Sequence, residues 1–194
     1  MNLLVLGPQG SGKGTQAARL AEDRGILHVS TGEMFRSAIA SGTELGLEVA
    51  PILAAGELVP DELTVALIRE RLSQPDAGDG FVLDGFPRNL AQAAALDTML
   101  GEIGRTLDAV FFFDLSDDVA LARLLARAQD EGREDDAPEV IERRLAIYHE
   151  QTEPVAEHYR ATGKLVPLHA DRSIGEVAAE IANALELLGE GAAA

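Results

Sequence analysis

The chain has 194 residues, a formal net charge of −17 and no cysteine. Its length allows one domain with a full hydrophobic core, and no apolar stretch approaches the ~20 residues that a membrane span needs. The acidic charge argues against a broad basic face for nucleic acid or an anionic membrane, and without cysteine there is neither a disulfide nor a thiolate zinc site. The opening MNLLVLG lacks the basic region and cleavage site of a signal peptide, so we expect a cytoplasmic protein, and we expect it to be a monomer.

Short apolar runs alternate with longer stretches of helical periodicity along the chain. The runs are apolar on consecutive residues, which is typical of buried parallel strands. The predicted strands are Leu3–Leu6, Ile26–Val29, Phe81–Leu83, Val110–Leu115 and Leu165–Leu168. The predicted helices are Thr15–Arg24, Glu62–Leu72, Ala91–Leu100, Val119–Ala128, Glu139–Tyr159 and Ile174–Leu188. Strands that alternate with helices predict a parallel α/β sheet with helices on both sides.

Two segments interrupt this alternation. Thr31–Pro60 has no strand signal and is interpreted as a set of short helices, while Gln129–Pro138 is a polar, glycine-containing surface loop. The helix breaks in the first segment are predicted at Gly42, Gly46, Pro51 and Gly56. Both segments follow a predicted strand or its helix, and ligands bind at that carboxyl edge of open α/β sheets. A helical insertion and a loop without a binding role are the alternative.

The first predicted strand runs into LGPQGSGKGTQ, which has the spacing Gly7-x4-Gly12-Lys13 and opens a helix. This is the context of a phosphate-binding loop. Glycines let backbone N–H groups turn toward an anion, and the helix N-terminus adds its positive dipole end. Lys13, one of only two lysines, would supply the charge for β- and γ-phosphates. The motif predicts a nucleoside triphosphate site, with an unoccupied glycine-rich turn as the alternative.

The position after the lysine departs from the usual motif. Ser or Thr there would hold Mg²⁺ through its hydroxyl, but this chain has Gly14 and only then Thr15. A metal therefore needs another anchor, and Asp84 offers one at the end of the apolar strand in FVLDGFPR. A lone carboxylate in that place is costly unless a cation compensates it. A turn aspartate before Gly85 is the alternative interpretation.

Arginine suits phosphates because its planar fork donates two parallel hydrogen bonds and never deprotonates. Seven of the sixteen basic residues lie in motif-like stretches beside the predicted cleft: Lys13, Arg36, Arg88, Arg123, Arg127, Arg133 and Arg144. An acidic protein that binds anions needs such a concentration of cations. Arg36 and Arg133 lie on glycine-bearing segments. We expect these segments to close over the site, which would exclude water from a phosphoryl transfer.

Seven stretches resemble the successive signatures of nucleoside monophosphate kinases, most closely those of the adenylate kinase family with a short lid. They are GPQGSGKGTQ, STGEMFR, GELVPDE, DGFPRNLAQ, RLLARA, GREDD and ERRLAIYHEQTEPV. The resemblance implies an α/β P-loop three-layer fold with a central five-stranded parallel sheet. It also implies a core of residues 1–29, 61–126 and 139–188, a helical NMP-binding insertion at 30–60 and a short lid at 127–138. The low-complexity end, 189–194, is expected to be a disordered tail.

The same resemblance implies roles for single residues. ATP phosphates would be held by Gly10, Ser11, Gly12, Lys13, Gly14 and Thr15. AMP would be held by Thr31, Arg36, the backbone of Glu57, Leu58 and Val59, and Gly85, Arg88 and Gln92. Arg123 would lie on the ATP adenine, Arg127 on the ATP phosphates, and Arg172 would touch the base through its backbone. Arg133 and Arg144 would clamp the transferring group and the AMP phosphate, and Asp84 would hold Mg²⁺ through waters. The implied catalytic set is Lys13, Asp84, Arg88, Arg127, Arg133 and Arg144.

The implied reaction is the reversible, Mg-dependent conversion of ATP and AMP into two ADP. Only Ala128–Gly132 separates Arg127 from Arg133, so the lid is minimal, and without cysteine no structural zinc is expected. The acceptor base leaves an alternative open: Asn89 is found in UMP/CMP kinases, whereas Gln92 stands where adenylate kinases read adenine with an amide. We expect AMP, with a UMP/CMP kinase or another nucleoside monophosphate kinase as the alternative.

Two further alternatives come from other classes of protein. A GTPase-type switch usually reads guanine with an Asn-Lys pair, but Lys13 and Lys164 both follow glycine. A catalytically silent nucleotide-binding module would not need the complete set of Lys13, Asp84 and arginines. The sequence therefore favours an enzyme over both.

Overall fold

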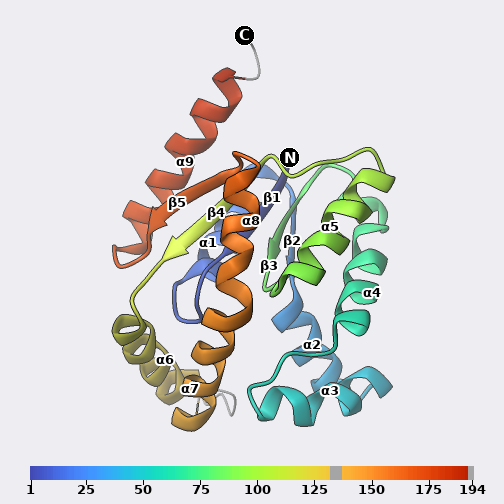
Figure 1. Ribbon diagram of the computed structural model, residues 1–194, viewed down its shortest axis with the longest axis vertical. Helices are drawn as coiled ribbons and strands as arrows, with labels where there is room; N and C mark the ends of the chain where they lie inside the picture. The colour runs from blue at the N-terminus through green and yellow to red at the C-terminus, as the bar shows by residue number, and fades with distance from the viewer. Residues whose placement is uncertain (132–136, 192–194) are drawn as a thin grey trace.

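The computed structural model describes residues 1–131 and 137–191. Its strands form one five-stranded, all-parallel sheet in the order β2-β3-β1-β4-β5 (Figure 1). The strands are β1 (Asn2–Leu6), β2 (Leu27–Ser30), β3 (Phe81–Asp84), β4 (Ala109–Asp114) and β5 (Leu165–His169). All five predicted strands are present, and no predicted end is more than one residue away from the observed one.

Helices cover both faces of the sheet because consecutive residues of a strand point to opposite sides. The helices that pack on the sheet are α1 (Lys13–Arg24), α4 (Asp61–Leu72), α5 (Leu90–Glu102), α6 (Asp117–Glu131), α7 (Pro138–Ile147), α8 (Glu153–Ala161) and α9 (Ile174–Gly191). On β1, Leu3 and Val5 pack with α1, α6, α7 and α9, whereas Leu4 and Leu6 pack with α4, α5 and α8. Figure 1 shows α8 crossing in front of the strands. The predicted three-layer α/β fold is confirmed. Among the described helices, none has the length and apolar character needed to cross a membrane.

Two further helices, α2 (Thr31–Ala40) and α3 (Glu44–Ala54), lie beyond the carboxyl ends of the strands (Figure 1). They enclose a small apolar cluster of their own around Phe35, Val49 and Val59. This cluster is separate from the two that flank the sheet, and Leu63 and Leu67 of α4 also pack against it. The segment is the helical insertion that the sequence predicts between β2 and α4.

The predicted helix breaks in this insertion are partly wrong. Gly42 lies between α2 and α3 and Gly56 follows α3, but Gly46 and Pro51 both lie inside α3. Gly46 is needed for close helix packing, since a Cβ there would lie 2.1 Å from the carbonyl oxygen of Ala38. Pro51 is exposed, so the backbone carbonyl that loses its helical partner at this proline can turn to water.

The predicted helix over Glu139–Tyr159 is also divided in the structure. A π-helical turn, η3 (Tyr148–Thr152), separates α7 from α8. Two other predicted ends were too early: α6 continues to Glu131, into the predicted loop, and α9 continues to Gly191, into the predicted disordered tail. Residues 132–136, which hold the rest of that loop and Arg133, lie outside the described residues.

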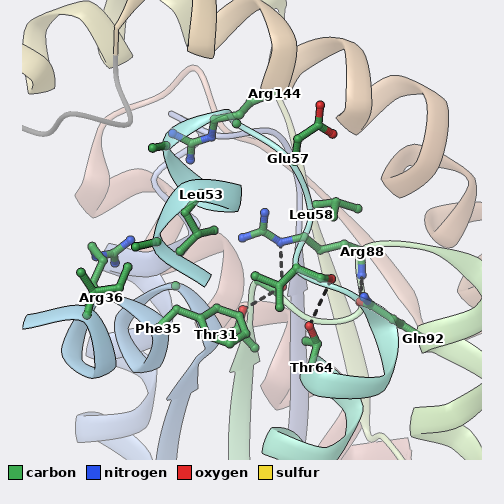
Figure 2. A pocket seen from close by; sticks show the side chains of 17 residues that line it. Thr31, Phe35, Arg36, Leu53, Glu57, Leu58, Thr64, Arg88, Gln92 and Arg144 are labelled. Atoms are coloured by element: carbon green, nitrogen blue, oxygen red, sulfur yellow. Dashed lines mark hydrogen bonds between the residues drawn. The ribbon is translucent and has the colours of Figure 1, made fainter. Parts of the chain in front are cut away.

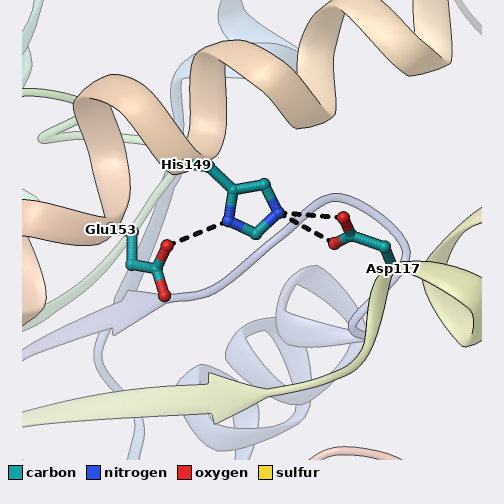
Figure 3. Close-up of polar contacts among 3 residues, drawn as sticks. All are labelled: Asp117, His149 and Glu153. Carbon is teal, nitrogen blue, oxygen red and sulfur yellow. Dashed lines mark hydrogen bonds and ion pairs between the residues drawn. The ribbon is translucent and has the colours of Figure 1, made fainter.

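The π turn is joined to the start of α6 through His149 (Figure 3). The ring Nδ1 lies 2.9 Å from Glu153 Oε2, and Nε2 lies 2.9 Å from Asp117 Oδ1. Hydrogen bonds to Glu153 and then Asp117 raise the pKa of His149 above its ordinary value, because a protonated imidazole can donate from both nitrogens. When protonated, the ring of His149 in the π turn is hydrogen-bonded both to the first residue of α6 and to the first residue of α8.

We expect His149→Gln to lower the melting temperature more near pH 6 than near pH 8.5. The folded-state pKa is raised, so the stabilisation is complete below the unfolded pKa of about 6.5 and is lost as the pH rises through the folded value. The side chain is 45% exposed, so the effect is at most about 1 kcal/mol. Thermal unfolding of both proteins across this pH range measures it, and an equal shift at both ends would contradict the assignment.

Candidate active site

The glycine loop connects β1 to α1 at the carboxyl edge of the sheet. Gly12 is the N-cap residue of α1 and has φ of 81°, a left-handed conformation that other residues rarely adopt. No side chain caps the first turn of α1, so its backbone N–H groups remain available to an anion. Lys13 Nζ lies 3.0 Å from the carbonyl oxygen of Pro8, to which it donates. Ser11 is 3% exposed and is absent from the lining of the cavity beside this loop.

A cavity of about 460 Å³ opens beside this loop. Its lining includes most of the predicted ATP residues: Gly10, Gly12, Lys13, Gly14, Thr15, Arg123 and Arg127. The structure brings six of the seven predicted cations around this cavity: Lys13, Arg36, Arg88, Arg123, Arg127 and Arg144. The seventh, Arg133, lies outside the described residues. A strongly acidic chain therefore lines one cleft with a group of cations.

The charged form of Lys13 is less favourable in the cleft than it would be in water. Loss of hydration in the cleft lowers the pKa of Lys13 from its ordinary value to about 8, while the Asp84 carboxylate acts in the opposite direction. Neighbouring positive charges reinforce the lowering; they are Arg88, Arg144 and Arg127. A polyphosphate in the cavity would add negative charge beside Lys13 and so favour its charged form.

A second cavity, of about 320 Å³, lies between the insertion and the sheet (Figure 2). Its lining includes nine residues predicted to bind AMP: Thr31, Arg36, Glu57, Leu58, Val59, Gly85, Arg88, Gln92 and Arg144. The side chains of Thr31 and Arg88 both donate to the carbonyl oxygen of Gly85, through Oγ1 and Nε, each at 2.9 Å. The side chain of Glu57 pairs with Arg143 of α7, at 2.6 Å between Oε1 and Nη2.

The two cavities meet along a shared wall. Three arginines line both of them: Arg36, Arg88 and Arg144. The smaller cavity also has apolar walls, which include Phe35, Leu53 and Val59. Two anions, one in each cavity, can therefore meet between the same three arginines. The smaller cavity can also accommodate an apolar ring.

Asn89, the residue that pointed to pyrimidine acceptors, has another role in the structure. Its Oδ1 accepts a hydrogen bond of 2.8 Å from the backbone N–H of Gln92 and so caps the start of α5. Asn89 is absent from the lining of the smaller cavity, whereas Gln92 belongs to it. The side chain of Asn89 thus serves the helix end.

Comparison with known proteins agrees with this geometry. The model of a family described as adenylate kinase matches residues 5–164. This chain belongs to the adenylate kinase family. It is 45% identical to an adenylate kinase of Stenotrophomonas maltophilia (strain K279a) over 96% of this chain and 100% of that protein. It is 48% identical to one of Parvibaculum lavamentivorans over 95% and 92%, and 46% identical to one of Xanthomonas campestris pv. campestris (strain 8004) over 95% and 99%.

In this member of the adenylate kinase family, Arg123 and Arg172 were both predicted to contact the ATP base, but only Arg123 lines a cavity. Arg123 lines the larger cavity, and its Nη1 also donates to the carbonyl oxygen of Ala170 at 2.8 Å, so it braces the end of β5. Arg172 is absent from the lining of both cavities, and its side chain is 49% exposed, with Nη1 3.9 Å from Glu180 Oε2. The sequence predicts that the backbone of Arg172 contacts the ATP base, and this stays a prediction.

Sequence reasoning missed two residues of the π turn. Tyr148 and Thr152 line the larger cavity, and Thr152 Oγ1 donates to the backbone carbonyl of Arg88 at 2.8 Å. A regular α-helix was expected here, and the wider π turn changes which side chains face the cleft. One signal was overlooked: Pro154 lies inside the predicted helix, where it has no N–H for the carbonyl four residues earlier, and α8 begins around it directly after the π turn.

Proposed function

We propose that this chain catalyses the reversible transfer of the terminal phosphoryl group of ATP to AMP, giving two ADP. Membership of the adenylate kinase family supports this function. The observation that carries it is the shared wall of Arg36, Arg88 and Arg144, since it lets the phosphates of two nucleotides meet end to end. The larger cavity takes ATP along the glycine loop, and the smaller one takes AMP.

The chemistry requires alignment and charge stabilisation from the protein. A phosphate oxygen of AMP attacks the γ-phosphorus of ATP, and the bond from that phosphorus to the β,γ-bridging oxygen breaks, so ADP forms on both sides. The attacking phosphate is already an anionic nucleophile, so neither a covalent enzyme intermediate nor a strong general base is needed. Lys13 and the arginines of both cavities hold the reactants in line and stabilise the charge on the transferring group.

A magnesium ion fits the donor set at Asp84. This carboxylate lines the larger cavity, and its Oδ2 lies 3.1 Å from the position that a Cβ at Gly14 would take. The missing side chain leaves room beside the carboxylate, and Mg²⁺ is usually held by one or two carboxylates, several waters and substrate phosphates. When bound with ATP, the ion would neutralise phosphate charge. Within residues 1–131 and 137–191, no group of three or more His, Cys, Asp or Glu side chains could hold a metal by itself.

The same proposal assigns a closing movement to two segments of the chain. The insertion at 30–60 closes over AMP and carries Arg36, and the lid at 127–138 closes over the ATP phosphates and carries Arg127 and Arg133. Closure excludes water, which would otherwise hydrolyse ATP. The chain acts on its nucleotides as a monomer in the cytoplasm.

A panel of acceptors tests the function. With ATP and Mg²⁺ we expect AMP to give the highest kcat/KM in a coupled assay of ADP formation, and we expect EDTA to abolish turnover. ATP without an acceptor should be hydrolysed far more slowly, which controls for a simple ATPase. UMP or CMP used as well as AMP would contradict the proposal in favour of a pyrimidine nucleotide kinase.

A further inference from the structure

We propose that Asp61 selects the acceptor base by holding the side-chain amide of Gln92 in one of its two orientations. The site then takes a 6-aminopurine nucleotide and rejects a 6-oxopurine one. This inference rests on the proposed function and concerns its AMP cavity. Asp61 is the first residue of α4, and Gln92 lies in the first turn of α5.

Two fixed partners determine the orientation of the amide. Gln92 Oε1 accepts from the backbone N–H of Arg88 at 2.8 Å (Figure 2), and Gln92 Nε2 donates to Asp61 Oδ1 at 2.7 Å. A backbone N–H can only donate and a carboxylate can only accept. Both partners therefore demand the same arrangement of oxygen and nitrogen.

The opposite orientation is disfavoured at both ends. It would place Nε2 against the N–H of Arg88 and Oε1 against the carboxylate of Asp61, so that donor faces donor and acceptor faces acceptor. Gln92 is only 2% exposed, so water cannot satisfy the mismatched groups, and buried unpaired polar groups are costly. Asn89 Nδ2 is a second donor to the same Asp61 Oδ1, at 2.9 Å.

The amide keeps capacity for a ligand. A primary amide has two N–H groups and two acceptor lone pairs, and the protein uses one of each. Gln92 lines the smaller cavity and is absent from the lining of the larger one, so it lies on the side where the base must be if the phosphate reaches the shared arginines. One donor and one acceptor in a fixed order remain to face that base.

Adenine matches this pair and a 6-oxopurine does not. Adenine offers an N–H donor at N6 beside a ring nitrogen acceptor, which pair with Oε1 and Nε2 respectively. Hypoxanthine and guanine have an acceptor oxygen at position 6, which would face Oε1. The base cannot turn over to avoid this contact while Arg36, Arg88 and Arg144 hold the phosphate, so the orientation of the amide decides between the two classes.

The experiment compares AMP with inosine monophosphate, which carries a 6-oxo group and no 2-amino group. The dissociation constants of both are measured by calorimetry without ATP, and kcat/KM is then measured for both with ATP. We expect the wild-type chain to prefer AMP by about tenfold or more, as a well-made bidentate contact allows. In Asp61→Asn, the new amide can donate to Oε1 of a turned Gln92, and we expect the preference to fall by about tenfold, chiefly through tighter binding of inosine monophosphate.

Asn89→Ser is the matched control. It keeps a capping oxygen for α5 and removes only the second donor to Asp61, so the preference should stay at the wild-type level. A purely structural role for Asp61 would weaken both nucleotides equally in Asp61→Asn, and that result overturns the inference. Equal binding of both nucleotides by the wild-type chain also overturns it, without recourse to a variant. Failure of the proposed function is seen separately, as binding of AMP without formation of ADP when ATP is added.

Discussion

Lys13→Met is expected to lower kcat for ADP formation by about 10³-fold while the protein remains folded. A preorganised cationic donor to the transferring phosphates is worth this order of rate. We expect the fold to persist, because the variant loses one hydrogen bond, to the carbonyl oxygen of Pro8, together with a charge that loss of hydration already disfavours by lowering the pKa of Lys13 to about 8. Turnover and thermal unfolding of the two proteins measure both effects. A variant with near-normal kcat would remove Lys13 from the catalytic machinery.

The lowered pKa of Lys13 predicts that ATP binding is coupled to protonation of this side chain. Polyphosphate favours the charged lysine, so ATP binding near pH 8.5 should be accompanied by proton uptake, and the affinity should weaken as the pH rises through the free-state pKa of about 8. Calorimetry in buffers of different ionisation enthalpy measures the uptake. Lys13→Arg is the control, because arginine stays protonated and should remove this pH dependence. Equal proton uptake in Lys13→Arg would assign it to another group.

Arg88→Ala is expected to lower kcat/KM for AMP by about 10³-fold, because this arginine lines both cavities and a single arginine at a transferring phosphoryl group can supply that factor. Arg88→Lys should recover only part of the loss, since lysine lacks the planar fork that binds two phosphate oxygens. Arg88→Ala loses the hydrogen bond from Nε to the carbonyl oxygen of Gly85. The hydrogen bonds of Arg88 with Gln92 and Thr152 are made by its main chain and remain, so we expect the cavity to keep its shape.

Arg69→Ala is the matched control for this loss. Arg69 is a 52% exposed arginine of α4 that pairs with Glu102 on the surface, and its removal takes away the same charge from a place remote from the cavities. Its kcat/KM for AMP should stay near the wild-type value. A comparable loss in both variants would mean that net charge, and not the position of Arg88, controls the reaction.

The layers of the fold could be predicted because parallel strands covered on both faces are apolar at consecutive residues. A run such as Phe81–Leu83, which follows Gly80 and ends at Asp84, is too short for a buried helix and therefore favours a buried strand. The errors lie where contacts between elements decide the local structure. Gly46 looks like a helix breaker, yet α3 needs it to approach Ala38 of α2, and nothing local to it reports that neighbour.

The candidate site likewise contains residues that could be predicted from the sequence and residues that could not. The places of Gly12 and Lys13 beside the larger cavity could be predicted because a phosphate-binding loop requires their chemistry at fixed spacing, and that of Arg88 because it lies in the motif-like stretch DGFPRNLAQ. Asp61 could not, since it reads as an acidic residue in the first turn of a helix, where it is favourable without any ligand. Only the packing of α4 beside α5 brings its carboxylate to Gln92.

The cations around the larger cavity belong to a chain whose net charge is −17. In about 0.15 M salt, electrostatic fields decay over about 8 Å, so an arriving nucleotide responds to the cleft only when it is close to the opening. In about 0.01 M salt the decay length grows to about 30 Å, and the acidic exterior then repels the same nucleotide from a distance. Capture of nucleotides is therefore a short-range event. Long-distance attraction therefore contributes little to its rate.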